Sequence, residues 1–321
     1  MNGPQLRSGW RRFGAALLAA AAAALASAAI AVQFADAGWV FDAATHFRWQ
    51  YLVAATVVAC AALLCHRPWL GLVAALAGAV HVPAVLGGAD RLARAADGEK
   101  ISLAISTANV SWRNEKIDGL LGRLKVADSD IVVLQEVRGH WHRAVESMLA
   151  RYPHVAPENW RAGAIVILSR HPIVGSRATH DTVTAEIDFK GRRIRVAGVH
   201  APTPLAADRW RAQDDLLARL AAAARAGSSP YVAAGDFNLT PYSPRFRRFL
   251  AASGLRRTTE SGIWPATWPT AGALRYAGPL WRGLEIDHVL ASDHFRLIGS
   301  YRGGDIGSDH FPVHTLLWLP R

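Results

Sequence analysis

The N-terminal third of the sequence is dominated by long stretches without charged side chains. Asp, Glu, Lys and Arg are absent from residues 13–35, 49–66 and 68–89. Each stretch is close to the roughly 20 residues that a helix needs to cross the hydrocarbon core of a bilayer. Trp49, Tyr51 and Trp69 lie at the ends of the second and third stretches, where interfacial aromatic residues are common. The pattern predicts about three transmembrane helices, and a soluble bundle of three buried helices is the alternative.

Basic residues set the expected orientation of these helices. Arg7, Arg11 and Arg12 precede the first stretch and favour a cytoplasmic N-terminus. Three crossings would then place the rest of the chain outside the cytoplasm as part of a multi-pass protein of the plasma (inner) membrane, although two arginines just after the third stretch favour the opposite side. The first stretch can also be interpreted as a signal peptide cleaved near residues 35–37, which leaves this orientation unchanged.

The character of the sequence changes near residue 98. Beyond it, short segments rich in β-branched residues alternate with helix-like segments. The expected strands are 101–110, 130–137, 162–169, 182–189, 193–200, 231–238, 283–291 and 311–319, and the expected helices are 115–127, 140–151, 207–226 and 244–253. Helices between strands predict sheets covered by helices. We therefore expect a membrane anchor over residues 1–98 and a globular α/β domain over residues 99–321.

Polar side chains recur at the ends of the apolar strands. They are Asn109, Glu136, His200, Asp236, Asn238, Asp287, Asp309 and His310. Burying such groups without partners costs several kcal/mol, so strand ends that face a common cleft are a natural place for them. We expect these side chains to converge if the neighbouring strands end at one edge of a sheet.

These residue types suit the hydrolysis of phosphate esters. Attack on a phosphodiester builds negative charge on the non-bridging oxygens, which a cation and hydrogen-bond donors can stabilise. Glu136 is the kind of hard oxygen ligand that Mg²⁺ or Mn²⁺ prefers, and Asn109 can orient the metal or a phosphate oxygen. Asp236 can act as the base for water, and Asn238 can hold that water or a phosphate oxygen.

Two histidines can complete such a site. His200 and His310 can donate hydrogen bonds to the phosphate, Asp287 can orient the ring of His310, and Asp309 is expected beside the metal. Taken singly, these residues have structural alternatives, since Asn and Asp are also common in turns and helix caps. The sequence contains no His-Glu-x-x-His zinc pattern and no glycine-rich nucleotide loop.

Six short segments carry a family resemblance. In order they are TANV, LQEV, GVHAP, AGDFN, EIDHVL and GSDHFPV, and together they resemble the motifs of the endonuclease/exonuclease/phosphatase superfamily. The resemblance implies a four-layered α/β sandwich, in which two central β-sheets are flanked by helices, and divalent-metal-dependent cleavage of phosphate esters. The sequence departs from the family pattern at Ser111, where a second Asn or Asp is often found.

The charge balance indicates an anionic substrate. In residues 100–321, 29 Lys and Arg stand against 20 Asp and Glu, a balance that suits an anionic partner. The candidate phosphate contacts are Arg192, Arg193, Arg247 and Arg248, and the segment IWPATWPT at 263–270 is a candidate for aromatic contacts with a base or with lipid. A membrane-tethered nuclease is the leading hypothesis. A phosphodiesterase or phosphatase acting on phospholipid head groups or small phosphoesters is the alternative, and an inactive membrane-bound binding module is the third hypothesis.

Overall fold

The computed structural model describes residues 3–87, 90–98, 102–259, 266–270 and 283–320. Residues 263–265 of the predicted aromatic segment therefore lie outside the described residues. The chain divides into two compact units: the first comprises residues 1–87 and 242–244, and the second comprises residues 88–241 and 245–321. The first unit is built mainly from the helices of the N-terminal third, and the second contains both β-sheets.

The N-terminal helices pack through small side chains. They are α1 (Gly3–Ala31), the 3-10 helix η1 (Val32–Ala37), α2 (Trp39–Thr45), α3 (Arg48–Leu64), α4 (Pro68–Ala79) and α5 (Val82–Leu86). Buried alanines, among them Ala29, Ala55 and Ala74, join α1, α3 and α4 in one cluster. A Cβ atom on Gly78 would lie 2.8 Å from the Cβ of Ala55, so glycine is what allows α3 and α4 to approach here.

Length and hydropathy identify one helix that is able to cross a membrane. It spans Gly9–Ala37, and a second span results if the bent pair α2 and α3, with a 64° angle between them, counts as one. Helix α4 has 12 residues, which corresponds to about 18 Å against a hydrocarbon core of about 30 Å. The described helices thus provide fewer spans than the three predicted, because the third charge-free stretch breaks before Pro83, whose missing N–H disfavours a continuous helix.

Two six-stranded mixed sheets form the centre of the second unit. The first has the order β11-β12-β1-β2-β4-β3 and the second the order β5-β6-β7-β8-β10-β9. The strands of the first sheet are β1 (Leu103–Asn109), β2 (Ile131–Gln135), β3 (His154–Ala156), β4 (Ile165–Ser169), β11 (Arg296–Arg302) and β12 (Val313–Trp318). Those of the second sheet are β5 (Ile173–Ala178), β6 (Thr182–Phe189), β7 (Arg192–His200), β8 (Tyr231–Asp236), β9 (Arg256–Arg257) and β10 (Asp287–Ala291). The pairs β1–β2 and β7–β8 are parallel, and the other pairs are antiparallel.

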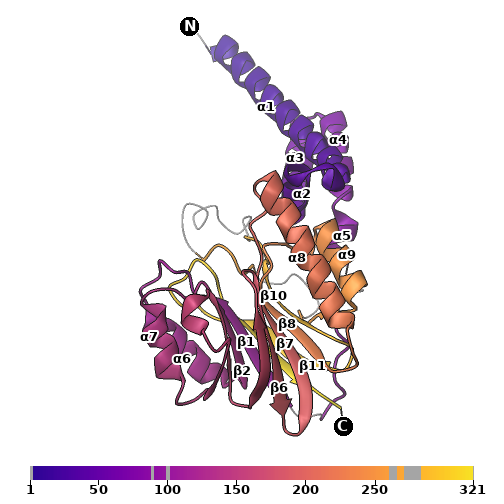
Figure 1. Ribbon diagram of the computed structural model, residues 1–321. Coiled ribbons are helices and arrows are strands. Elements are labelled where there is room, and N and C mark those ends of the chain that lie inside the picture. Colours follow the sequence, from indigo (N-terminus) through magenta and orange to yellow (C-terminus); the bar gives the residue numbers. More distant parts are fainter. Residues whose placement is uncertain (1–2, 88–89, 99–101, 260–265, 271–282, 321) are drawn as a thin grey trace. The chain divides into compact units, whose positions relative to one another are not determined.

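Helices cover the outer faces of both sheets, with α6 and α7 on one side and α8 and α9 on the other (Figure 1). They span α6 (Ile117–Ala127), α7 (Trp141–Met148), α8 (Ala207–Arg225) and α9 (Pro244–Ser253), and the short 3-10 helix η2 (Trp160–Ala162) precedes β4. A third cluster of buried side chains fills the space between the sheets, where aliphatic residues of β1, β2 and β4 face those of β6, β7 and β8. The predicted four-layered α/β sandwich is confirmed.

The sheets approach each other closely at Gly198 of β7. A Cβ atom at this position would lie 2.9 Å from Cγ1 of Val133 on β2 and 3.0 Å from Cγ2 of Ile165 on β4. The first contact is shorter than real Cβ atoms tolerate and the second is tighter than most, so a larger side chain would require the facing side chains or the sheets to shift. Gly198 lies two residues before His200 and therefore sets the spacing of the sheets next to the predicted site.

Candidate active site

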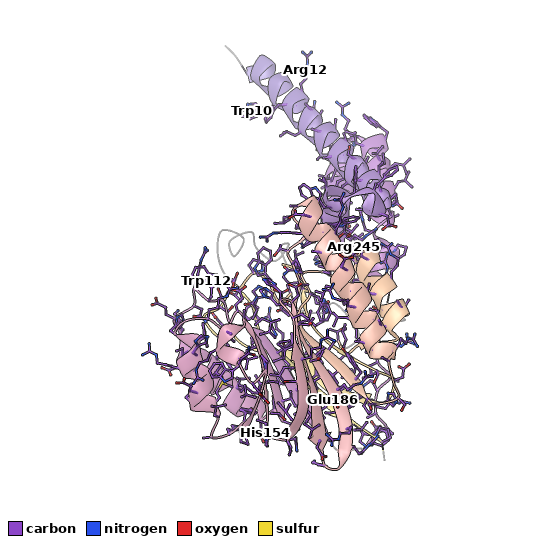
Figure 2. The ribbon with its side chains drawn as sticks, viewed as in Figure 1. Trp10, Arg12, Trp112, His154, Glu186 and Arg245 are labelled. Atoms are coloured by element: carbon purple, nitrogen blue, oxygen red, sulfur yellow. The ribbon has the colours of Figure 1, made fainter. Side chains whose placement is uncertain are left out.

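The predicted polar residues gather at one edge of the sandwich. In the two parallel pairs Asn109 lies opposite Gln135, next to Glu136, and His200 lies opposite Asp236. Strand β10 runs antiparallel to β8, and its first residue, Asp287, lies opposite Asp236. Figure 2 shows Trp112 towards this end of the sandwich and shows His154 and Glu186 at the other end.

The backbone at this edge adopts conformations that are uncommon for residues other than glycine. Ser111, Glu136 and Asn238 have φ angles of 53°, 61° and 50°. A left-handed conformation costs roughly 1–2 kcal/mol for an ordinary residue, and such strain is common at functional sites. Gly235, directly before Asp236, has φ of 149°, and a Cβ atom there would lie 1.9 Å from the carbonyl oxygen of Val199. Only glycine therefore allows β8 to pair with β7 at this point.

Asn109 joins the two sheets through hydrogen bonds to two carboxylates. Its Nδ2 donates to Oε1 of Glu136 at 3.1 Å and to Oδ2 of Asp236 at 3.2 Å. The other oxygen of Glu136, Oε2, accepts the backbone N–H of Trp112 at 3.1 Å. The side chain of Asp236 is 2% exposed and that of Glu136 is 25% exposed. Glu136 can therefore be reached from solvent, whereas Asp236 lies beneath it.

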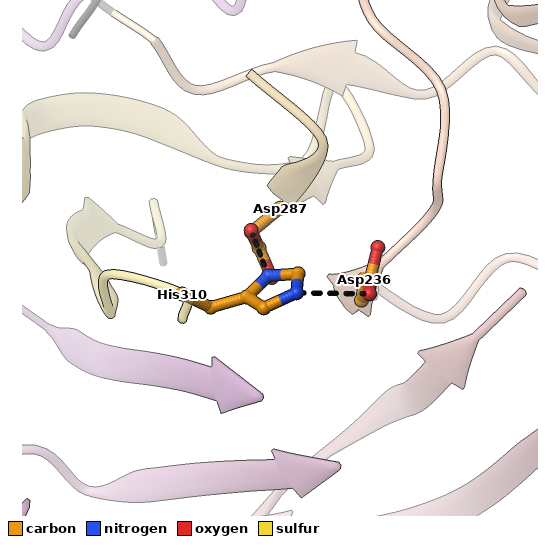
Figure 3. Close-up of side chains that lie close together, drawn as sticks. All are labelled: Asp236, Asp287 and His310. Carbon is orange, nitrogen blue, oxygen red and sulfur yellow. Dashed lines mark hydrogen bonds and ion pairs between the residues drawn. The ribbon is translucent and has the colours of Figure 1, made fainter. Parts of the chain in front are cut away.

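A carboxylate–imidazole–carboxylate chain crosses the site (Figure 3). Nδ1 of His310 lies 2.9 Å from Oδ2 of Asp287, and its Nε2 lies 3.8 Å from Oδ2 of Asp236. All three side chains are buried. Oδ1 of Asp287 is also buried and has no hydrogen-bond partner among the described residues. Its negative charge is therefore directed mainly at the ring of His310.

The surroundings raise the pKa values of both Asp236 and His310. Burial and the charge of Asp287 raise the pKa of Asp236 to about 6, although the two histidines and the N–H of Asn238 oppose the increase. Burial alone would lower the pKa of His310, but the charges of Asp287 and Asp236 dominate and raise it to about 10. At neutral pH the site therefore contains an imidazolium next to a carboxylate whose pKa is close to the surrounding pH.

His200 and Asn238 complete the cluster. Nε2 of His200 lies 3.8 Å from Oε1 of Glu136 and 4.0 Å from Oδ2 of Asp236. The backbone N–H of Asn238 donates to Oδ1 of Asp236 at 2.8 Å, and its Nδ2 donates to the carbonyl of Ala201 at 2.9 Å. Seven of the eight predicted residues thus form one connected group: Asn109, Glu136, His200, Asp236, Asn238, Asp287 and His310.

Asp309 is the predicted residue that lies outside this group. It is exposed, and its carboxylate accepts a hydrogen bond from Nε1 of Trp268 at 3.3 Å. Within the described part of the chain it makes no hydrogen bond or ion pair with Glu136 or Asn109. Its negative charge acts on the neighbouring His310, whose pKa it helps to raise.

Sequence reasoning missed two hydroxyl groups that hold the site in place. Oγ1 of Thr267 accepts the backbone N–H groups of Ile286 and Asp287, each at 3.1 Å. Oγ of Ser308 donates to the carbonyl of Asn109 at 2.8 Å and accepts the N–H of His310 at 3.1 Å. These contacts join segments far apart in the sequence, so the only signal was the position of Thr267 and Ser308 within segments already singled out for other reasons.

Comparison with known proteins identifies the family. Residues 106–310 match the family model described as Endonuclease/Exonuclease/phosphatase family. This range contains all seven residues of the connected group. The chain belongs to the endonuclease/exonuclease/phosphatase family. Members of this family are phosphoester hydrolases.

Solved structures of the endonuclease/exonuclease/phosphatase type share the fold. A protein of this type from Beutenbergia cavernae is 23% identical, with a TM-score of 0.55 over 68% of this chain and 72% of that chain. An AP endonuclease from Archaeoglobus fulgidus is 17% identical, with a TM-score of 0.54 over 67% and 98% of the two chains. Beta toxin from Staphylococcus aureus, solved with bound magnesium ions, is 15% identical, with a TM-score of 0.53 over 67% and 99%. No curated protein sequence matches the chain.

The donor atoms of the site fit the divalent cation that the family generally requires. The carboxylate of Glu136 provides hard oxygen ligands, and its partial exposure leaves room for the waters that Mg²⁺ retains. The amide oxygen of Asn109 accepts the backbone N–H of Ser111 at 3.0 Å, so Asn109 meets Glu136 through its Nδ2 and can hold that carboxylate in place for a cation. Ligand atoms of Asp236, Asp287 and His310 also lie within 4.8 Å of one another. An imidazolium cannot bind a cation, however, and the high pKa of His310 makes the Glu136 side of the site the better match.

An open pocket extends from the site of this family member. It has a volume of about 720 Å³, and His200, Arg138, Arg161 and Arg209 are among the residues that line it. Arg138 and Arg209 are exposed and make no side-chain hydrogen bond or ion pair within the described part of the chain. By contrast, Arg192 begins β7, about 26 Å along the strand from His200. Arg192 and its neighbour therefore lie away from the site, and as phosphate contacts of a longer polynucleotide they stay a prediction.

Proposed function

We propose that this chain is a membrane-anchored, divalent-metal-dependent phosphoesterase that hydrolyses phosphodiester bonds in nucleic acid. The observation that carries the proposal is the buried chain Asp287–His310–Asp236, which meets Glu136 and Asn109 at the joint edge of two sheets. An imidazolium, a carboxylate of raised pKa and an accessible hard oxygen ligand are the groups that attack of water on an anionic diester requires. The family has this chemistry in common.

In this proposal each residue acts on a different part of the reaction. Asp236 accepts the proton of the attacking water, since its pKa of about 6 leaves it ionised at neutral pH and still basic enough to take a proton. His310, held by Asp287, donates to a phosphate oxygen as an imidazolium, and His200 and Asn238 donate from the side of the pocket. Glu136 would hold Mg²⁺ or Mn²⁺, with Asn109 orienting its carboxylate, and the ion would supply positive charge for the phosphate oxygens.

The pocket supports a polynucleotide as the substrate. Arg138 and Arg209 make no side-chain hydrogen bond or ion pair among the described residues and line the pocket that begins at His200, so they are available for phosphates next to the scissile one. Trp112, whose backbone N–H contacts Glu136, is 50% exposed and lies 4.8 Å beneath the guanidinium of Arg113, an arrangement suited to a stacked base. Phospholipid head groups are the second candidate, favoured by Leu205, which is 65% exposed in the segment after His200.

The anchor and the domain boundary belong to the same proposal. Residues 1–98 would hold the protein in the plasma membrane and residues 99–321 would form the catalytic domain. The span Gly9–Ala37 supports the anchor, and the arginines before it support an extracytoplasmic catalytic domain. A further crossing by the second charge-free stretch, as the bent pair α2 and α3, is part of this proposal.

The full-length chain, extracted from membranes with detergent, is the material for the test. It should cleave plasmid DNA or RNA and a simple aryl phosphodiester with Mg²⁺ or Mn²⁺, and EDTA should abolish the activity. Spheroplasts that express the chain should cleave an added substrate that cannot cross the membrane. Cleavage of phospholipid vesicles without cleavage of polynucleotides would favour the second candidate, and the absence of any hydrolysis would leave only an inactive binding module.

The pH dependence of kcat/KM should be bell-shaped with limbs near pH 6 and pH 10. Below about pH 6 Asp236 becomes protonated and loses its function as a base, and above about pH 10 His310 loses the proton that it donates. A cation bound at Glu136 favours the ionised form of Asp236 and shifts the acid limb to lower pH. Initial rates measured across this range check the prediction. A rate that rises as the pH falls below about 6 would exclude Asp236 as the base.

A further inference from the structure

A buried glutamine lies behind the loops that carry two of the site residues. Gln213 of α8 has no exposed surface. Its Nε2 donates to the carbonyl oxygen of Pro202 at 3.0 Å and to that of Phe237 at 3.1 Å. Pro202 follows His200 by two residues, and Phe237 lies between Asp236 and Asn238. A single amide group therefore joins the segment after β7 to the segment after β8.

The front of the same two segments is held by different bonds. The backbone N–H of Ala201 donates to the carbonyl of Asp236 at 2.8 Å, and Nδ2 of Asn238 donates to the carbonyl of Ala201 at 2.9 Å. Asn238 is itself proposed to contact the phosphate, so its bond to Ala201 lies on the substrate side of the two segments. Gln213 is the contact that holds the segments from the side away from the substrate.

Arg245 of α9 fixes the direction in which this amide faces. Its Nη1 donates to Oε1 of Gln213 at 2.8 Å. Its Nε donates to Asp214 at 2.7 Å and its Nη2 donates to the carbonyl of Trp210 at 2.8 Å. Arg245 as a whole residue is 2% exposed. A guanidinium has only donors, so the oxygen of Gln213 must face Arg245 and its NH₂ group must face the two carbonyls.

We infer that Gln213 is a positioning residue for the hydrolytic reaction, oriented by Arg245 and holding His200 and Asn238 at their distances from Asp236. The inference rests on the proposed function, because it assigns Gln213 to the same site. An apolar side chain could fill the volume of Gln213, but it would leave two buried carbonyls without donors and free to separate. A misplacement of about 1 Å in a site of this kind can reduce the rate about 100-fold.

The test is Gln213→Glu. The carboxylate has the shape of the amide and can pair with Arg245, but it has no N–H for either carbonyl and repels both. We expect kcat to fall by about 10- to 100-fold while KM changes little, because the substrate still binds but the reacting groups are displaced. Amide hydrogen exchange should accelerate at Ala201, at Thr203 and in residues 237–240. Gln213→Leu, which buries no charge, should give the same pattern and replaces the first variant if that variant does not fold.

Two control variants on α8 separate positioning from stability. Leu220→Ala removes a buried side chain two helical turns away, so it should lower the melting temperature but leave kcat unchanged at temperatures well below melting. Asp215→Asn changes only an exposed carboxylate and should alter neither quantity. A folded Gln213→Glu variant with the kcat of the wild type would overturn the positioning role of Gln213 and leave the proposed function standing. If the wild-type protein hydrolyses no phosphoester, the proposed function is wrong, and unchanged hydrogen exchange in the variant would then overturn the inference separately.

Discussion

Asp236→Asn should lower kcat by about 10²- to 10⁴-fold, and no excess of metal should restore it. The amide keeps the shape of the carboxylate and can still accept the N–H of Asn238, which donates to Asp236 at 2.8 Å. It cannot accept a proton from water, so the loss falls on the chemical step. The measurement is a titration of the hydrolysis rate with Mg²⁺ and Mn²⁺ in both proteins. Turnover near that of the wild type would exclude Asp236 as the base.

Glu136→Gln provides the contrast in the same titration. The substitution keeps the shape of the side chain but removes the charge that holds the cation, so apparent metal affinity should fall and added Mn²⁺ should recover part of the rate. The matched control is Glu186→Gln, which changes an exposed carboxylate at the opposite end of the sandwich (Figure 2). Equal metal affinity in the wild type and in Glu136→Gln would remove Glu136 from the metal site.

Asp287→Asn should reduce kcat by up to about 10⁴-fold without changing apparent metal affinity. Asp287 lies 2.9 Å from Nδ1 of His310 and supplies much of the negative charge that raises the pKa of His310 to about 10. Removing that charge lowers the pKa, so the protonated ring is lost at a lower pH. The alkaline limb of the pH profile should therefore move down from about pH 10.

Asp293→Asn is the control for Asp287→Asn. Asp293 lies just beyond the other end of β10, where it forms an exposed ion pair with Arg256 at 3.5 Å, and such pairs contribute little to stability. This variant should keep both the rate and the pH profile of the wild type. An alkaline limb that stays near pH 10 in Asp287→Asn would show that Asp287 does not set the protonation of His310.

The central strands could be predicted from sequence because they are buried on both faces. In β1, β2 and β8 every residue is buried, so the sequence shows mainly apolar or small side chains that lead to a polar residue at the end of the strand. The strands that the sequence analysis missed lie away from this central region. Strand β5 is exposed along most of its length, β11 contains a register shift between Leu297 and Gly299, and β3 and β9 have three and two residues. Segments of this kind leave no clear periodic pattern.

The site could be predicted in part for the same reason. Asn109, Glu136 and Asp236 stand out because a polar group directly follows a buried run. Thr267, Ser308 and Gln213 act through bonds to backbone groups that are distant in the sequence. Nothing about a threonine or a glutamine within a turn or helix indicates such a partner, because the partner is determined by the pairing of the two sheets. The geometry of the hydrogen bonds therefore required the structure.

The close approach of the two sheets at Gly198 has a consequence for how heating would affect the site. Asn109 and Glu136 belong to one sheet and His200, Asp236 and Asp287 to the other, so the bonds that define the site bridge the sandwich. The distances within the site therefore depend on how the two sheets are placed relative to each other. Heating that lets the sheets slide past each other by a fraction of an ångström would lengthen these contacts while every strand stays intact. On heating, hydrolytic activity should therefore be lost at a lower temperature than secondary structure.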